Sequence, residues 1–570
     1  MTRPPTTGGG GWVISVLVAG TIWVFWGGGS LAALVSSGVW PGVEIGDVAR
    51  ITVGTVFHLD DPAAAWPEPW RSRMPSAEVM YLGGLAALVT ALAIAAGLVR
   101  EWRVVADGVR RGPKGDPEAA RWAGRRSLRG LLVRRPEAGR LTLGRFGRSL
   151  VAAEARHSVL VAGPTQAGKT AGLVMPAILE WQGPVVATSV KGDLLDTTIH
   201  RRREMGPVCV FDPTEATPHK RTSATPLRSC GSWQQARQVA HWLTQASRPT
   251  SGAGLQDANF WYGQAEKLIA PLLFSARHQG ATVDQVVRWL DLGPAARAEV
   301  EAGLVDEPRA LDAWQACQGR EPKQLSSIYA TAELILGCFA DPKVARNSER
   351  DEYNPAALLD GGMATLYLVA PLHEQERLAP LFATMVQEVV RIATEITAAA
   401  GTDQGAGGLS PPLLLALDEL ANIAPLPDLD KIASTGAANG IQLLSAIQDL
   451  SQLRERFGVN RAQTIVNNHR ARVFASGLGD PETLGYIQRV TGAGQYAQRS
   501  ETVGDGRGSR TEGVLYRDLA PANVVREQKP GEAVLIYGSR PPARIRLRPW
   551  YKEKRLSGLA KPAGKEKADG

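Results

Sequence analysis

Two long apolar stretches without charges open the hydrophobic pattern of the chain. No charged side chain occurs between Pro4 and Val43, and residues 13–35 within that stretch are mostly apolar. A second charge-free stretch covers residues 79–99, where small residues recur at every fourth position. Each stretch is long enough to cross a bilayer as a helix. We therefore predict two N-terminal transmembrane helices, at about 13–35 and 79–99, joined by an external loop at residues 36–78.

A cleaved signal peptide explains the first stretch less well. The only basic residue before it is Arg3, and the apolar run is longer than the core of a signal peptide. Basic side chains are sparse in residues 36–78 and dense in residues 100–142. The positive-inside rule then puts the loop outside and the chain after residue 99 in the cytoplasm, as in a multi-pass protein of the inner (cytoplasmic) membrane. The basic linker 100–142 suits contact with membrane lipid or nucleic acid, and equally a solvated connection.

Farther along the chain, short apolar runs alternate with helical patterns, which is typical of α/β proteins. Residues 158–162 form a β-branched run typical of a buried strand, and a helical pattern ends near Trp181. The loop between them fits the P-loop pattern G-x4-G-K-[ST] and consists of Gly163, Pro164, Thr165, Gln166, Ala167, Gly168, Lys169 and Thr170. We expect this loop to bind ATP, with Lys169 on the β- and γ-phosphates and Thr170 on Mg²⁺.

An acidic pair ends another apolar run. Residues 412–417 read as a buried strand, and Asp418 and Glu419 follow directly. We expect Asp418 to bind ATP-associated Mg²⁺ together with Thr170, and Glu419 to polarise the attacking water as a catalytic residue beside Lys169. Two acids would also suit the N-terminus of a helix, but the apolar run before them favours a strand end.

Polar residues follow two more strand-like runs. Residues 184–190 lead into Lys191, and residues 441–447 lead into Gln448. Ligands bind at the carboxyl ends of parallel strands, so Gln448 is a candidate catalytic residue that senses the γ-phosphate or positions water. An exposed glutamine with no such role fits the spacing as well.

Helical patterns divide the region after the linker. Residues 143–228 and 354–548 carry the strand-like runs, and we expect them to form one nucleotide-binding domain. Residues 229–353 show apolar positions at three- and four-residue spacing and are predicted to form an inserted all-α domain. Residues 549–570 are rich in charge and are predicted to be a disordered basic tail.

Composition changes this picture little. The chain has 570 residues, enough for several cores, and a formal net charge of +8 that suits contact with phosphate or anionic lipid. Its 4 cysteines form no CxxC pair and have no histidine at metal-ligand spacing, so we expect reduced thiols in a reducing compartment.

Together these motifs resemble the conjugative coupling proteins of type IV secretion systems, the TraG/TraD-like ATPases. The resemblance also rests on Val-Lys-Gly-Asp-Leu at 190–194, Phe-Asp-Pro at 211–213, Leu-Asp-Glu-Leu-Ala-Asn at 417–422 and Arg-Pro-Trp-Tyr at 548–551. It implies a RecA-like P-loop domain, a homo-hexameric ring and an inserted α-domain that recognises the substrate. It further implies relaxase-bound DNA or effector proteins as substrates, a secretion channel as partner, and a sensor role for Gln448.

One feature departs from the family pattern. Many members carry an arginine that serves a neighbouring subunit's nucleotide, placed before the glycine that opens the Gln448 strand. Residues 434–440 contain no basic side chain. Where it operates, an arginine finger accelerates turnover by orders of magnitude. Arg470 and Arg472 are candidate substitutes, although both also fit the pattern of surface charges.

Two other functions stay open. A membrane-anchored DNA translocase of the FtsK kind shares the motor, but that family has more membrane spans and a C-terminal winged-helix reader for which this tail is too short. A docking platform that binds nucleotide with little turnover fits the missing arginine. The sequence leaves open whether the cargo is DNA, protein or both.

Overall fold

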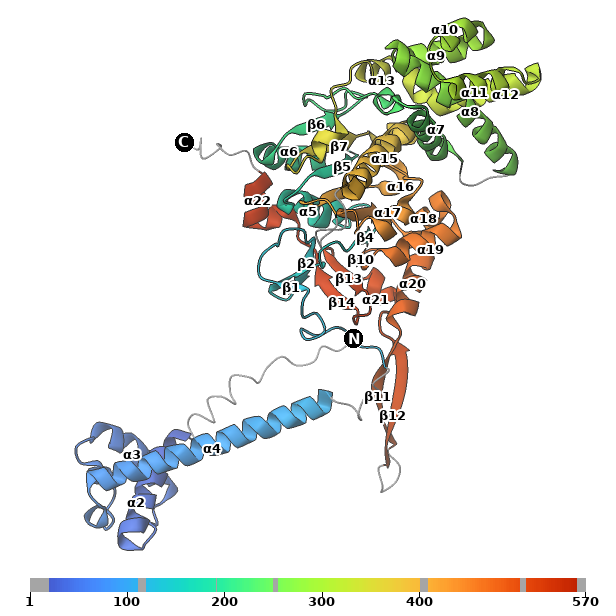
Figure 1. Ribbon diagram of the computed structural model, residues 1–570. Coiled ribbons are helices and arrows are strands. Elements are labelled where there is room, and N and C mark those ends of the chain that lie inside the picture. Colours follow the sequence, from blue (N-terminus) through green and yellow to red (C-terminus); the bar gives the residue numbers. More distant parts are fainter. Residues whose placement is uncertain are drawn as a thin grey trace. The chain divides into compact units, whose positions relative to one another are not determined.

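Figure 1 shows a computed structural model of the chain, which describes residues 20–110, 119–190, 192–249, 255–399, 408–502 and 509–560. The chain divides into two compact units, one of residues 1–117 with 496–514 and one of residues 118–495 with 515–570. Parts of the predicted features lie outside the described residues, namely the beginning of the first apolar stretch, residues 111–118 of the linker, Lys191, and the end of the tail from residue 561.

The N-terminal unit contains a small cluster of helices: η1 (Trp23–Gly27), α2 (Gly28–Ser37), α3 (Ile45–Phe57) and α4 (Ala77–Arg110). α2 packs closely on α4 because both helices present glycine at the contact. A Cβ atom on Gly28 would lie only 2.5 Å from the Cα of Gly84, so the backbones could not approach this far with larger residues. Within the residues that the structure describes, no helix combines the length and the apolar character needed to cross a membrane.

The larger unit is built around a mixed sheet of 12 strands in the order β1-β3-β2-β14-β13-β10-β4-β9-β8-β5-β7-β6. The strands from β10 to β6 run parallel: β10 (Ala471–Ala475), β4 (Val159–Ala162), β9 (Ile441–Ile447), β8 (Leu413–Leu417), β5 (Val185–Ser189), β7 (Thr365–Val369) and β6 (Val208–Phe211). The others pair antiparallel: β1 (Leu132–Val133), β3 (Ser149–Ala152), β2 (Thr142–Phe146), β14 (Ala543–Arg546) and β13 (Glu532–Tyr537). A separate pair consists of β11 (Ala493–Thr502) and β12 (Ser509–Asp518).

Both faces of the parallel region are buried. Successive residues of β4 alternate between two hydrophobic clusters, with Leu160 in one and Val161 in the other. The long helix α15 (Gln375–Ala399) contributes to the first cluster, and α5 (Met175–Glu180) and α6 (Asp193–Met205) contribute to the second. A parallel sheet covered by helices on both sides confirms the predicted α/β class.

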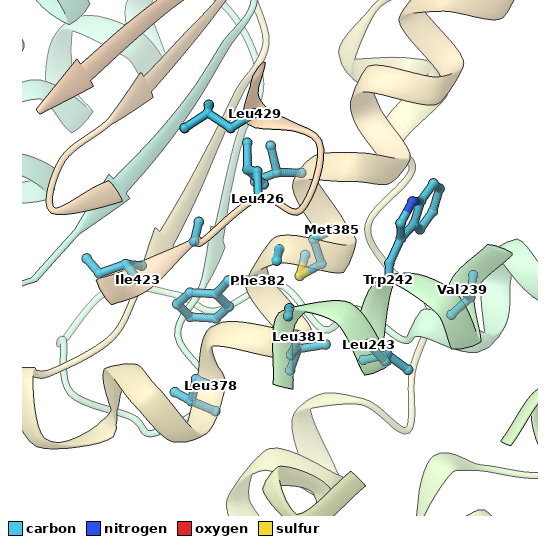
Figure 2. Packing of buried hydrophobic residues seen from close by; sticks show 14 of the residues in the cluster. Val239, Trp242, Leu243, Leu378, Leu381, Phe382, Met385, Ile423, Leu426 and Leu429 are labelled. Carbon is cyan, nitrogen blue, oxygen red and sulfur yellow. The ribbon is translucent and has the colours of Figure 1, made fainter. Parts of the chain in front are cut away.

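Between β6 and β7 the described chain is helical, over the range where an inserted all-α domain is predicted. Its main helices are α7 (Trp233–Ser247), α8 (Leu255–Gln279), α9 (Val283–Leu292), α10 (Arg297–Ala302), α11 (Pro308–Gln318), α12 (Pro322–Leu336) and α13 (Pro342–Asn347). Figure 2 shows Trp242 and Leu243 of α7 beside Leu381 and Met385 of α15, all within one hydrophobic cluster. The helical insertion therefore shares its core with the sheet and is packed onto it.

Residues 119–142 do not form the linker predicted for them. Leu128 and Leu131 are 1% and 0% exposed and belong to the cluster on the α5 face of the sheet. β1 in the same segment pairs with β3. The many arginines of this segment make it look solvent-exposed in the sequence. In the structure they also bind the body, and Arg140, for example, donates to the carbonyls of Gly130 and Ala153. The folded body therefore begins before residue 143.

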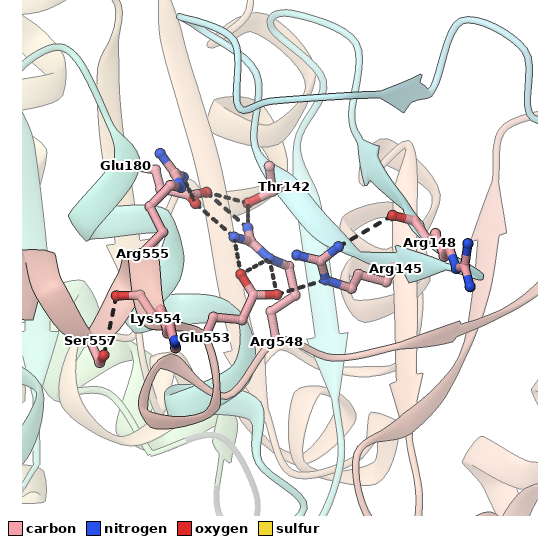
Figure 3. A network of polar contacts seen from close by, with 9 residues as sticks. All are labelled: Thr142, Arg145, Arg148, Glu180, Arg548, Glu553, Lys554, Arg555 and Ser557. Atoms are coloured by element: carbon pink, nitrogen blue, oxygen red, sulfur yellow. Dashed lines mark hydrogen bonds and ion pairs between the residues drawn. The ribbon is translucent and has the colours of Figure 1, made fainter.

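The predicted disorder of residues 549–570 is also wrong for the part described. α22 (Lys554–Ala560) packs against α5 and α6. Beside it lies the side chain of Arg548, which is 1% exposed and forms ion pairs at 2.8 Å with both Glu180 and Glu553 (Figure 3). Thr142 accepts a further hydrogen bond of 2.7 Å from the same guanidinium. Two charges of this segment, Glu553 and Arg555, are therefore paired with the body.

Arg548→Met should destabilise the protein by about 3 kcal/mol, because it removes the buried cation that Glu180 and Glu553 share. Thermal melting measures the loss. The matched variant Arg555→Met changes an arginine that is 52% exposed and pairs with the same Glu180, so its cost should stay below about 1 kcal/mol. Equal losses in the two variants would contradict a special role for Arg548.

Acid should weaken the same ion-pair cluster. Burial acts to raise the pKa of Glu553, but hydrogen bonds from Arg548 and Arg145 outweigh it and lower the pKa from 4.5 to about 2. Since the pKa is lowered on folding, this stabilisation is present above pH 4.5 and lost as the pH falls toward 2. Melting temperatures over this range should therefore converge for the wild type and Arg548→Met.

Candidate nucleotide-binding site

The P-loop leaves the end of β4 in a conformation that exposes backbone donors. Gln166 and Gly168 adopt positive φ angles of 65° and 83°, and Gly163 donates to the carbonyl of Ile447 at 3.3 Å. Among the described residues nothing accepts from the N–H groups of Thr165, Gln166 and Gly168. A Cβ on Gly163 would lie 2.8 Å from the Cβ of Ala475, so the loop requires glycine there. Such a row of free N–H groups suits an anion such as a phosphate.

Lys169 lies inside the loop, only 5% exposed. Its ammonium donates to the carbonyl oxygen of Gly163 and, at 3.0 Å, to that of Pro164. Burial lowers the pKa of Lys169, and the nearby carboxylates of Glu419, Asp418 and Asp449 oppose this effect. The ammonium therefore contacts carbonyls of its own loop and lies near three carboxylates. Phosphate oxygens of a bound nucleotide could replace the carbonyls as its hydrogen-bond partners.

Thr170 and Asp418 meet directly. Thr170 begins a π-helical turn (η4, Thr170–Val174) that continues into α5, and its hydroxyl donates to Oδ2 of Asp418 at 2.7 Å. The carbonyl of Asp418 accepts from the Thr188 hydroxyl at 2.7 Å. Asp418 is 5% exposed, and its Oδ1 has no partner among the described residues. A hydroxyl beside an unpartnered carboxylate oxygen is an oxygen donor set that fits Mg²⁺.

Burial is the main cause that raises the pKa of Asp418 to about 6. The charges of Glu419 and Asp193 act in the same direction, whereas the hydrogen bond from Thr170 and the charge of Lys169 act against it. Three acids, of which Asp418 is buried, therefore face one ammonium at the P-loop, and this excess of negative charge favours a divalent cation.

Glu419 and Gln448 lie next to each other at neighbouring strand ends. Glu419 has a left-handed backbone conformation, with φ 50° and ψ 44°. Nε2 of Gln448 donates to its carboxylate at 3.2 Å. A non-glycine residue in this conformation is held there by its surroundings, and such positions are enriched at functional sites. The structure thus brings Lys169, Thr170, Asp418, Glu419 and Gln448 to one edge of the sheet.

Two further polar residues lie at this site, and the sequence alone predicts no individual role for either. Ser189 ends β5 and is 0% exposed, yet its hydroxyl has no partner among the residues described. Gln452 accepts from the backbone N–H of Gln448 at 3.1 Å. The position of Ser189 at a strand end was a usable signal, whereas nothing in the sequence marked Gln452.

Arg470 and Arg472 lie elsewhere. β10 begins at Ala471, which pairs with Val159 at the start of β4, whereas the P-loop follows the end of β4. Arg472 donates to the hydroxyl of Tyr486 at 2.6 Å. The structure therefore brings neither arginine to the P-loop of the same chain.

Comparison with known proteins gives a consistent result. A family model described as type IV secretory system conjugative DNA transfer matches residues 110–568. The chain is 27% identical over 424 residues to protein VirD4 of Rhizobium rhizogenes, an alignment covering 73% of this chain and 61% of that protein. It is also 27% identical over 458 residues to VirD4 of Agrobacterium fabrum, an alignment that covers 77% of this chain and 66% of that protein. To the conjugal transfer protein TraG of Escherichia coli it is 25% identical over 465 residues, and this alignment covers 75% of this chain and 72% of that protein. The chain thus spans less than two thirds of the length of either VirD4 protein.

Solved structures agree on the fold. The bacterial conjugative coupling protein TrwBdeltaN70 in complex with sulphate has a TM-score of 0.57 at 18% identity, covering 77% of this chain and 96% of that chain. The plasmid coupling protein TrwB in complex with ADP and Mg²⁺ has a TM-score of 0.56 at 18% identity, with the same coverage. At this identity the likeness concerns the fold alone, and it agrees with the α/β class predicted for this part of the chain.

Asp418→Asn should stabilise the protein free of nucleotide and metal at about pH 8. Burial raises the pKa of Asp418 from 3.8 to about 6, so its ionised form costs stability above pH 6, and this cost disappears below pH 3.8. The pKa difference corresponds to roughly 3 kcal/mol. Melting in a chelating buffer should show a gain near pH 8 that shrinks as the pH falls toward 4. An unchanged melting temperature near pH 8 would speak against a buried charge at this position.

Proposed function

Because the chain belongs to the type IV secretory system conjugative DNA transfer family, we propose that it is a coupling ATPase for a secretion channel. It binds ATP with Mg²⁺ and delivers relaxase-bound DNA, protein effectors or both. The observation that carries the proposal is the 2.7 Å contact between Thr170 and Asp418, with Lys169 and Glu419 beside it. The relative TrwB is known in complex with ADP and Mg²⁺, which supports the same ligands here.

Each site residue has a role in hydrolysis under this proposal. The free N–H groups of the P-loop bind the phosphates, and the ammonium of Lys169 leaves the loop carbonyls for the β- and γ-phosphate oxygens. Thr170 and Asp418 hold Mg²⁺, which when bound neutralises charge on those oxygens. The carboxylate of Glu419 accepts a proton from the attacking water, and the amide of Gln448 donates to the γ-phosphate or orients that water.

A docking platform that binds nucleotide with little turnover is the second candidate. Residues 434–440 lack the arginine that many family members supply to a neighbouring subunit. The structure keeps Arg470 and Arg472 away from the P-loop of their own chain, and a neighbouring P-loop in a homo-hexamer is the remaining place where either would act.

We also propose that the N-terminal unit anchors the protein in the inner membrane. The charge-free stretches at 13–35 and 79–99 support this proposal. So do the large apolar side chains that α4 leaves exposed on one side, which are Leu82, Leu85, Val89 and Leu92, with exposures of 57% to 64%. An exposed apolar helix face suits a lipid environment.

Lys169→Ala should abolish ATP hydrolysis, because the P-loop loses the cation that contacts the β- and γ-phosphates. Glu419→Gln should keep nucleotide binding and lower the hydrolysis rate about 100-fold or more, because it removes the base and preserves the shape. Phosphate release by the full chain in detergent, with and without single-stranded DNA, measures both effects. A wild-type rate equal to that of Lys169→Ala under both conditions would favour the docking platform.

The membrane topology is testable with reporter fusions. A periplasmic reporter inserted after Glu68 should be active, and the same reporter after Arg126 should be inactive, because the basic residues after residue 99 hold that side in the cytoplasm. A cytoplasmic reporter should give the opposite pattern at the two positions. Activity on the same side for both fusions would exclude a span between them.

A further inference from the structure

The carboxylate of Glu419 belongs to a closed ring of hydrogen bonds. Gln448 donates to it from its side chain, and the backbone N–H of Gln448 donates to Oε1 of Gln452 at 3.1 Å. Nε2 of Gln452 donates to Asn422 at 3.2 Å, and the backbone N–H of Asn422 donates to the carbonyl of Glu419 at 2.9 Å. The ring therefore fixes Glu419 from both sides, and Gln452 is its link to another helix.

That helix is α18 (Leu450–Phe457), which reaches from the ring to the helical insertion. Asp449 caps its start by accepting from the N–H of Gln452 at 2.8 Å. Arg456, one turn beyond Gln452, donates to the carbonyl of Ala246 at 2.6 Å. Ala246 lies in the last turn of α7, where carbonyls lack partners within the helix and a cation is favourable.

The Arg456 contact is partly buried. Burial lowers the pKa of its guanidinium, and Glu376 opposes this effect. A partly buried cation that donates to a carbonyl oxygen makes a charge-assisted, directional contact. One short helix thus has the candidate hydrolytic site at one end and the first long helix of the insertion at the other.

A cavity of about 1060 Å³ lies beside α18. Asn422, Gln452 and Arg456 line it, together with Gln375, whose Nε2 is buried without a hydrogen-bond partner among the described residues. Side chains that border open space can change rotamer without disturbing a packed core. The ring is therefore able to rearrange while the sheet stays intact.

We propose that α18 couples Glu419 to the helical insertion, with Gln452 and Arg456 as positioning residues at its two ends. The proposal rests on the proposed function, because it assigns a control to the same carboxylate. A shift of the insertion moves Arg456 and α18, Gln452 then displaces Gln448, and the Glu419 carboxylate becomes free to accept a proton from water. The coupling is reciprocal. A γ-phosphate that draws Gln448 away from Glu419 therefore shifts the conformational equilibrium at the end of α7 by the same coupling free energy.

Hydrogen–deuterium exchange on the full chain in detergent tests this coupling. Exchange of amides in residues 243–247 is measured with Mg²⁺ and either ADP or a non-hydrolysable ATP analogue. In the wild type we expect the two states to differ by about five-fold or more. Arg456→Met should abolish the difference without changing nucleotide affinity. Arg456→Lys should retain it, because an ammonium can donate to the same single carbonyl.

Arg454→Met is the matched control, since Arg454 lies on the same helix but pairs with Glu482 outside the insertion. It should retain the exchange difference. Gln452→Leu, at the other end of α18, should also abolish the exchange difference. It should lower kcat about ten-fold and leave the KM for ATP unchanged, because the side chain of Gln452 contacts no nucleotide under the proposal. This variant keeps the test valid if Arg456→Met folds poorly.

Two results would overturn the coupling. One is equal exchange in both nucleotide states of a wild type that binds both nucleotides, and the other is a difference that persists in both Arg456→Met and Gln452→Leu. Titration with a fluorescent nucleotide separates these results from a failure of the proposed function, in which the wild type binds no better than Lys169→Ala.

Discussion

The site depends on one constraint, which is that β9 lies between β4 and β8 and that the three strands end together. Ala162 pairs with Ile447, and Leu417 pairs with Ser445, so the P-loop, Gln448 and Asp418 all follow at the same edge. These strands are buried on both faces. A slip of one residue would turn every side chain of a strand to the opposite cluster, so core packing holds the register. The chemistry at the edge is therefore positioned by hydrophobic residues that take no part in it.

Electrostatics at that edge favour a ligand. Asp418, Glu419 and Asp193 place negative charge around a single buried ammonium, and burial opposes ionisation of both Asp418 and Lys169. A divalent cation beside Asp418 would offset the repulsion among the acids, and phosphate oxygens would give Lys169 better partners than two carbonyls. The binding of each ligand therefore makes the binding of the other more favourable. This reciprocity is a physical reason for nucleotide and metal to bind together.

Much of the sheet could be predicted from the sequence, because its buried parallel strands appear as short apolar runs with polar residues at their ends. The runs before Gly163, Asp418 and Gln448 are of this kind, and the structure places their ends side by side. The antiparallel extension through β1, β2 and β3 was missed, since arginines there outnumber the few leucines that reach the core. Their burial depends on partners distant in sequence, such as β14 near the C-terminus.

Contacts between distant segments that are made through polar atoms have no recognisable pattern in the sequence. Arg548 pairs with Glu180, far earlier in the chain, and a charged C-terminal segment seen alone is typical of disorder. The ring around Glu419 is similar, because Gln452 shows its role only when Asn422 and Gln448 are placed beside it. Periodicity reports burial of apolar side chains, and it carries no information on which buried polar groups will meet.

The C-terminal segment extends this reasoning to the P-loop itself. The backbone N–H of Arg548 donates to the carbonyl of Gly172 at 3.0 Å, and a Cβ on Gly172 would lie 3.0 Å from Leu547. Gly172 belongs to the π-helical turn that carries Thr170. A π turn departs from the regular i→i−4 hydrogen-bond pattern, and the N–H of Arg548 reaches the Gly172 carbonyl from outside the turn. Arg548 thus supports the turn with its backbone and holds α5 through Glu180 with its side chain. The geometry of Thr170 therefore depends on residues near the C-terminal end of the folded body.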